Sequence, residues 1–106
     1  MGGAIAAREA RIAKDCAKRA KEIARMCLLF KKPFMVVTQM LASMENHPVP
    51  TRAEVNDIFH SVLDGASSLM LTGETAMGQY PVEAMQMLSD TAFEAQRYQM
   101  EAKFLP

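Results

Sequence analysis

Residues 32–85 decide the fold, and they read KPFMVVTQMLASMENHPVPTRAEVNDIFHSVLDGASSLMLTGETAMGQYPVEAM. Two short segments in this stretch, 34–37 and 68–71, have the length of strands and are each followed by Thr. The first is an unbroken apolar run, which is typical of a strand buried on both faces of a parallel sheet. A helical pattern separates the two segments, and parallel neighbours require such a crossover. The stretch therefore predicts a strand–helix–strand unit.

The helix between the two strands carries its own start and stop signals. Thr51 and Glu54 form a capping box, in which the Thr side chain takes the amide of Glu54 and the Glu side chain reaches back. Gly65 ends the helix. The apolar positions recur at helical spacing: Val55, Ile58, Phe59, Val62 and Leu63. We expect this stripe to face the sheet.

Further helices are predicted on both sides of this unit. Residues 4–29 contain neither Gly nor Pro and consist of good helix formers. Their apolar stripe is predicted to pack inward: Ile5, Ile12, Cys16, Ala20, Ile23, Cys27 and Phe30. Pro81 suits the first turn of a last helix that frays near Phe104, and residues 72–78 are predicted to be a loop. The predicted class is α/β, in the order helix–strand–helix–strand–helix with two parallel strands.

The charge of the chain is zero overall but is unevenly placed. Residues 1–32 hold nine basic and three acidic residues, a net charge of +6, and residues 33–106 carry −6. We therefore divide the chain into a basic amphipathic helix, residues 1–31, and one folding unit, residues 32–106. The basic side of that helix is the predicted interface with an acidic surface, and its residues are Arg11, Lys14, Lys18 and Arg25.

The cysteines and histidines do not suggest a metal site. Cys16 and Cys27 stand eleven residues apart on one helix, beyond disulfide reach, and neither His47 nor His60 has ligand spacing to them. We expect two reduced, buried cysteines, no bound metal and a reducing compartment, the cytoplasm. A mitochondrial location is the alternative, because the chain opens rich in Ala and Arg. No run of 18 apolar residues exists, so we expect no membrane span.

The decisive stretch resembles the pyruvate kinase family. The matching pieces follow one another in order: KP-F-MVVTQML-SM at 32–44, PTRAE at 50–54, VLDGA at 62–66 and ML-GETA-G-YP-EA at 70–84. The resemblance implies a partial (β/α)8 barrel that contains the last two strands and their helices. Active sites of such barrels lie at the carboxyl ends of the strands. The resemblance therefore implies that Thr38 and Thr72 line the phosphoenolpyruvate site.

The same resemblance shows what these residues do not supply. In the family, a lysine, the Glu and Asp that hold a divalent metal, and an Arg with a potassium site lie on earlier strands. We identify none of these groups here, so the isolated chain is expected to use no cofactor, whereas the family uses magnesium and potassium. Phosphoryl transfer depends on positioning and on cations that neutralise charge. We expect no phosphotransfer from the chain alone.

Three functions remain open from the sequence. The first is a pyruvate-kinase-derived, non-catalytic structural subunit of a larger assembly. The second is a piece of an active enzyme that transfers phosphate from phosphoenolpyruvate to ADP in glycolysis and is completed by another chain. The third is a nucleic-acid binder that uses the basic helix. We place the third last, because the helix lacks interleaved aromatics and a charge run alone is weak evidence.

The two predicted strands point to a protein partner. Two parallel strands leave open edges and an apolar face that they cannot cover themselves. We therefore expect other protein chains to cover them, in a hetero-oligomer or a homo-oligomer.

Overall fold

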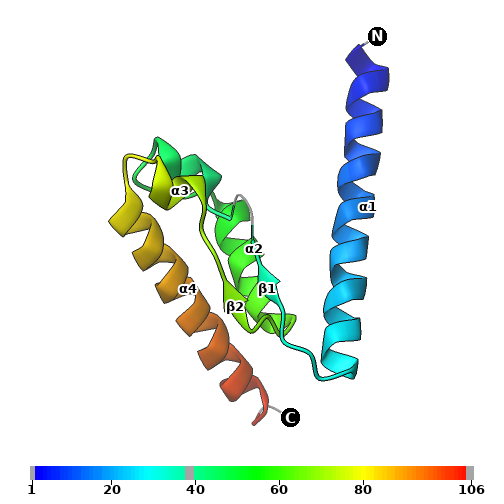
Figure 1. The fold of residues 1–106 in the computed structure, drawn as a ribbon, viewed down its shortest axis with the longest axis vertical. Helices are drawn as coiled ribbons and strands as arrows, with labels where there is room; N and C mark the ends of the chain where they lie inside the picture. Colours follow the sequence, from blue (N-terminus) through cyan, green and yellow to red (C-terminus); the bar gives the residue numbers. More distant parts are fainter. Residues whose placement is uncertain (1, 38–39, 105–106) are drawn as a thin grey trace. The chain divides into compact units, whose positions relative to one another are not determined.

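The computed structural model describes the backbone of residues 2–37 and 40–104 and the side-chain burial of residues 7–37 and 40–104. The chain divides into two compact units, Met1–Pro33 and Phe34–Pro106, which are described separately. The elements appear in Figure 1 in this order: α1 (Gly2–Leu29), β1 (Met35–Val36), η1 (Ala42–Glu45), α2 (Arg52–Leu63), β2 (Ser68–Leu69), α3 (Gly73–Ala76) and α4 (Pro81–Ala102).

The first unit is the single helix α1 and the turn that ends it. The helix closes with amides that bond back to earlier carbonyls: Lys31 N to Leu28 O at 3.2 Å and Lys32 N to Cys27 O at 2.7 Å. Lys31 adopts a positive φ of 54°, the left-handed conformation in which helices commonly end. Pro33 follows and prevents the helix from continuing.

The apolar stripe of α1 is exposed within the described residues. Ile12 is 53% exposed and Ile23 is 60% exposed, so the prediction that this stripe packs inward is wrong in this structure. The prediction of two buried cysteines is also wrong, because Cys16 is exposed and Cys27 is only half-buried. The physical reason is that unit Met1–Pro33 is one helix, which has no second layer of its own to cover an apolar face.

The second unit is built on two parallel strands. Met35 pairs with Ser68 and Val36 with Leu69, as the sequence predicts. The ladder extends on both sides, where Ser67 N donates to Phe34 O at 2.8 Å and Met70 N donates to Val36 O at 3.0 Å. The strands are two residues each, shorter than the predicted segments 34–37 and 68–71.

One hydrophobic core lies between the strands, η1 and the two long helices α2 and α4. Ile58 of α2 is fully buried, as the capped, periodic pattern of this helix predicts. In α4, Ala84 and Leu88 face this core. The core consists of Met40, Leu41, Met44, Ile58, Leu71, Ala84 and Leu88, with Val36, Leu69 and Met87 against it.

The C-terminal halves of α2 and α4 contact each other outside this core. The rings of Phe59 and Tyr98 are 5.6 Å apart between centroids and tilted by 59°. The side chain of Gln99 donates to the carbonyls of Val62 at 3.3 Å and Leu63 at 3.4 Å. The Val62 carbonyl also accepts from Gly65 N at 3.0 Å, so Gln99 adds a link from α4 to the last turn of α2.

Two elements were not expected from the sequence. The 3-10 helix η1 follows β1, and the single turn α3 lies in the segment 72–78 that was predicted to be a loop. Both short helices follow a strand, and they contact each other. They therefore gather at the carboxyl ends of the two parallel strands (Figure 1).

Candidate functional site

The candidate site is the group of segments at the carboxyl ends of β1 and β2. In α/β proteins with parallel strands, ligands bind at this edge, because loops of neighbouring strands meet there. Here the edge is formed by residues 40–45, which include η1, and by residues 72–78, which include α3. A buried carboxylate from one segment and a half-buried carboxylate from α2 hold it together.

Glu74 is the buried carboxylate, with 1% of its surface exposed. Its Oε2 accepts a hydrogen bond from Leu41 N at 3.1 Å, and its Oε1 accepts from Thr72 N at 3.2 Å and from the Thr72 hydroxyl at 3.3 Å. The residues it joins follow different strands. Glu74 therefore ties the segment after β1 to the segment after β2.

The ionised form of Glu74 suits this environment. Burial raises the pKa of the Glu74 carboxyl, but hydrogen bonds from the amides of Glu74 itself, Leu41 and Thr72 and from the Thr72 hydroxyl lower it. The hydrogen bonds outweigh burial, so the pKa lies below the ordinary value of 4.5. A carboxylate that accepts from several backbone amides is stabilised as the anion, which makes it a structural tie at neutral pH.

Glu54 is the second carboxylate, and it does more than the capping box requires. The box is present as predicted: Thr51 Oγ1 accepts from Glu54 N at 3.3 Å, and Thr51 N donates to Glu54 Oε1 at 2.8 Å. In addition, Ser43 N donates to Glu54 Oε2 at 2.8 Å and the Ser43 hydroxyl donates to Oε1 at 2.5 Å. Glu54 thus fastens η1 to the start of α2.

The pKa of Glu54 follows the same logic. Burial raises it, whereas hydrogen bonds from the hydroxyl and amide of Ser43 and from the amide and hydroxyl of Thr51 lower it. The result is a pKa below the ordinary value of 4.5. Two ionised carboxylates from two different elements therefore hold the segment after β1, at Leu41 and at Ser43.

The two glycines beside α3 allow a close approach to η1. A Cβ on Gly73 would overlap a carboxylate oxygen of Glu45, and a Cβ on Gly78 would lie 2.6 Å from the carbonyl oxygen of Glu74. The backbones also meet directly, since Gln79 N donates to Glu45 O at 2.8 Å. The Glu45 carboxylate ends a flexible side chain and can turn away from a Cβ on Gly73. A Cβ on Gly78 would meet backbone atoms of Glu74 and Glu45, so a side chain at Gly78 would push η1 and α3 apart.

Of the two predicted substrate-lining residues, the structure describes one. Thr38 lies outside the described residues. Thr72 is described: it is exposed, it stands directly before α3, and its hydroxyl points to Glu74 as a donor. Sequence reasoning named Thr72 but missed Glu74 and the second role of Glu54. The only signal for Glu74 was a Glu within the GETA motif.

The described carboxylates do not form a metal site. No group of three His, Cys, Asp or Glu is arranged to hold an ion in the part of the chain that the structure describes. Glu54 and Glu74 use their oxygens to accept hydrogen bonds from amides and hydroxyls of this chain. His47 lies in a loop with its Nδ1 3.1 Å from Ser43 O, and His60 is an exposed residue of α2.

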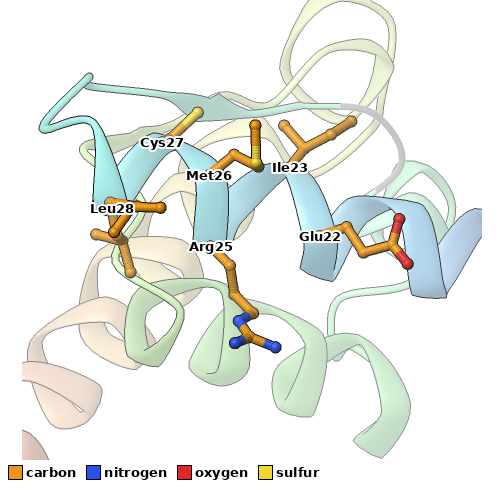
Figure 2. Close-up of a pocket in the computed structure, with 7 residues that line it drawn as sticks. Glu22, Ile23, Arg25, Met26, Cys27 and Leu28 are labelled. Atoms are coloured by element: carbon orange, nitrogen blue, oxygen red, sulfur yellow. The ribbon is translucent and has the colours of Figure 1, made fainter.

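The predicted interface residues lie on one side of α1, and the structure leaves them exposed: Arg11, Lys14, Lys18 and Arg25. Figure 2 shows the last turns of this helix, where Arg25 projects away from the side that carries Ile23, Met26 and Cys27. Ile23 and Met26 are 60% and 57% exposed and line a shallow hollow. Among the described residues, no helix is long and apolar enough to cross a bilayer.

Comparison with known proteins identifies the family. The family model described as "Pyruvate kinase, barrel domain" matches residues 11–85. The chain is similar to "Pyruvate kinase" of Thermotoga maritima, with 49% identity over 77 residues, which are 73% of this chain and 16% of that protein. "Pyruvate kinase" of Candida albicans is 49% identical over 77 residues, covering 73% of this chain and 15% of that protein.

A plant relative gives the same result. "Pyruvate kinase isozyme G, chloroplastic" of Ricinus communis is 50% identical over 72 residues, which are 68% of this chain and 17% of that protein. The chain therefore spans about a sixth of the length of the curated relatives it matches. Both the family model and these relatives show that the chain belongs to the pyruvate kinase family.

Proposed function

We propose that this chain is a barrel fragment that acts as a packing module in a larger assembly and does not transfer phosphate by itself. The observation that carries the proposal is the two-stranded sheet. Among the described residues, β1 pairs with β2 and with nothing else. Met35 of β1 is 51% exposed, and Met70, which follows β2, is 43% exposed. Open strand edges and exposed apolar residues favour association with further protein.

The chemistry of the candidate site supports the second half of this proposal. Thr72 offers a hydroxyl, but that hydroxyl is a donor to Glu74, a buried carboxylate that also serves two backbone amides. A hydroxyl needs a base or a metal to take part in catalysis. The magnesium and potassium used by the family would have to be held by residues other than the described carboxylates.

One observation favours a second candidate, in which the chain is part of a catalytic barrel that another segment or chain completes. The edge that would face phosphoenolpyruvate is held by hydrogen bonds within the chain, from Ser43 N to Glu54 and from Leu41 N to Glu74. Pre-arranged loops are what phosphoryl transfer requires, because its catalysis is mostly positioning and electrostatics. In this case Thr72, and Thr38 outside the described residues, would contribute to the site.

A complementation assay separates the two candidates. The 106-residue chain is assayed with phosphoenolpyruvate, ADP, magnesium and potassium, first alone and then with a pyruvate kinase chain from which the matching strands and helices were deleted. We expect no turnover alone and a stable complex with the deleted enzyme. Turnover by the chain alone would contradict the proposal. Turnover only in the complex would establish the catalytic candidate, and loss of that turnover in Thr72→Ala would place Thr72 in the site.

A further inference from the structure

The outer surface of α4 has a charged row and an apolar row side by side. The side of α4 that faces the core carries Ala84, Leu88 and Ala95. On the solvent side, Val82, Phe93 and Met100 are 74%, 59% and 65% exposed. Their spacing of eleven and seven residues places them in one row along the helix. Next to it, about a quarter of a turn further round, lies a row of exposed acidic residues: Glu83, Asp90, Glu94 and Glu101.

The acidic row remains negatively charged although one basic residue lies beside it. Arg97 lies 3.4 Å from Glu94 and 3.6 Å from Glu101, and its side chain is 56% exposed. Ion pairs exposed to this extent contribute little to stability, and salt screens them. Asp90 accepts a neutral hydrogen bond from Gln86 at 2.8 Å, which leaves its charge in place. α4 therefore presents an extended acidic surface.

The surface of α1 has the matching pair of rows. Arg11, Lys14, Lys18 and Arg25 are exposed and follow spacings of three, four and seven residues, which place them on one side of the helix. The basic row spans 14 residues, about 21 Å at 1.5 Å per residue, and the acidic row of α4 spans about 27 Å. Beside the basic row runs a row of small residues: Ala10 and Ala17 are exposed, and Ala24, which continues the row, is 7% exposed.

The order of the rows sets the direction of packing. On each helix, going around the axis in the same sense, the uncharged row comes first and the charged row about a quarter of a turn later. When two helices face each other, only an antiparallel arrangement then brings base opposite acid and the alanines opposite the apolar row at the same time. The small alanines leave room for Phe93 and Met100, and close approach buries both.

We propose that α1 of one copy of this chain docks antiparallel onto α4 of a second copy, with its basic row on the acidic row. The two-fold relation lets each copy donate one helix and receive one. This inference goes beyond the proposed function and does not depend on it, because it uses neither the strand edges nor the candidate site. A second copy is favoured over a nucleic acid because the chain itself carries the complementary row, with apolar residues beside the charges.

The test is the oligomeric state of the full chain in solution, measured by sedimentation at 50 and 500 mM salt. We expect a dimer at micromolar concentration in low salt and at least tenfold weaker association in high salt, because exposed charges are screened. The double variant Lys14→Glu/Lys18→Glu is expected to weaken dimerisation at least tenfold, and so is the double variant of the facing acids, Glu94→Lys/Glu101→Lys. Mixing the two double variants is expected to restore a heterodimer.

Matched controls separate the docking face from general charge effects. Arg8→Glu/Arg19→Glu makes the same charge change on the other side of α1, and Asp57→Lys makes an acid-to-base change on α2; both are expected to keep the dimer. Carbodiimide cross-linking is expected to join Lys14 to Glu101 and Lys18 to Glu94 between copies, the antiparallel pairs. Circular dichroism confirms that each variant is folded.

Four results would overturn the inference. The first is a monomer at both salt concentrations, including one in which the same cross-links form within one chain. The second is equal weakening by Arg8→Glu/Arg19→Glu and Lys14→Glu/Lys18→Glu. The third is failure of the two charge-reversed variants to associate when mixed. The fourth is a chain that stays monomeric and binds duplex DNA through the basic row.

Discussion

The two units of this chain are held in shape by different means. Unit Phe34–Pro106 has a buried core and hydrogen bonds between residues far apart in sequence, such as Leu41 to Glu74 across 33 positions. In unit Met1–Pro33, helix α1 is described with helical hydrogen bonds, a closing turn and mostly exposed side chains. The difference shows that the helical structure of α1 depends on local helix propensity, whereas the fold of the second unit depends on tertiary contacts.

The largest loss of stability is expected from a substitution that removes volume from the core. Ile58→Ala should lower the free energy of unfolding by about 3 kcal/mol, because Ile58 is fully buried and the change leaves a cavity. Ile12→Ala on α1 is the control and should change stability by less than about 0.5 kcal/mol, because Ile12 is 53% exposed. Urea unfolding of both variants measures this, and equal losses would mean that α1 is as well packed as the core.

The next effect concerns the carboxylate that joins the two strand ends. Glu74→Ala should destabilise the chain by about 2–3 kcal/mol, because the amides of Leu41 and Thr72 lose their acceptor in a buried place. Asp57→Ala removes an exposed carboxylate from α2 and serves as the control. If thermal unfolding gave the same midpoint for both variants, Glu74 would not be a structural tie.

Lowering the pH should reproduce part of the loss of stability expected for Glu74→Ala, without any mutation. The pKa values of Glu54 and Glu74 are lowered in the folded chain, so the unfolded chain takes up protons first as the pH falls. Their contribution is complete above the unfolded value of 4.5 and disappears as the pH falls through the folded pKa values. The urea midpoint should therefore decrease below pH 4.5, and by less in Glu54→Gln/Glu74→Gln than in the exposed control Glu9→Gln/Glu22→Gln. A midpoint that rose in acid would contradict the assignment.

A smaller effect is expected at the start of α2. Thr51→Ala removes the acceptor of Glu54 N and should cost about 1 kcal/mol. Ser89→Ala on the exposed side of α4 is the control. An unchanged midpoint for Thr51→Ala would mean that the Glu54–Ser43 bonds hold this end of α2 without the cap.

The smallest effect should stabilise the first unit. Lys31→Gly removes the steric cost of a positive φ at the end of α1 and should stabilise the helix by about 0.5–1 kcal/mol. Slower amide exchange at Lys32, whose N–H bonds to Cys27 O, would report it. Lys32→Gly, at a residue without a positive φ, is the control and should not slow exchange in this way.

Some of this structure follows from short-range patterns. The Thr51–Glu54 box, the turn at Gly65 and Pro81 at the start of α4 were predicted because each depends on residues within a few positions of one another. The parallel pairing of the two strands was predicted because a crossover helix separates them. Family membership follows from the ordered motifs in residues 32–85, and the comparisons confirm it.

Other features depend on contacts that no local pattern reports. The bonds from Glu54 to Ser43 and from Glu74 to Leu41 join residues 11 and 33 positions apart, so only the folded chain shows them. The turn α3 was missed for the same reason, since its first residues are arranged around the Glu74 carboxylate. The exposure of the α1 stripe was also missed, because an apolar stripe predicts a partner but not whether the chain itself provides one.

The sequence by itself therefore determined the family, the long helices α1, α2 and α4, the capping box of α2 and the uneven charge, because these depend on residue type and on spacings of a few residues. Only the tertiary structure decided which carboxylates are buried and what they hold. Burial depends on which distant segments meet, and a carboxylate becomes a tie only where amides from two such segments reach it. The two glutamates look alike in the sequence as members of the PTRAE and GETA motifs. In the fold, Glu54 and Glu74 hold the same segment after β1, at Ser43 and at Leu41.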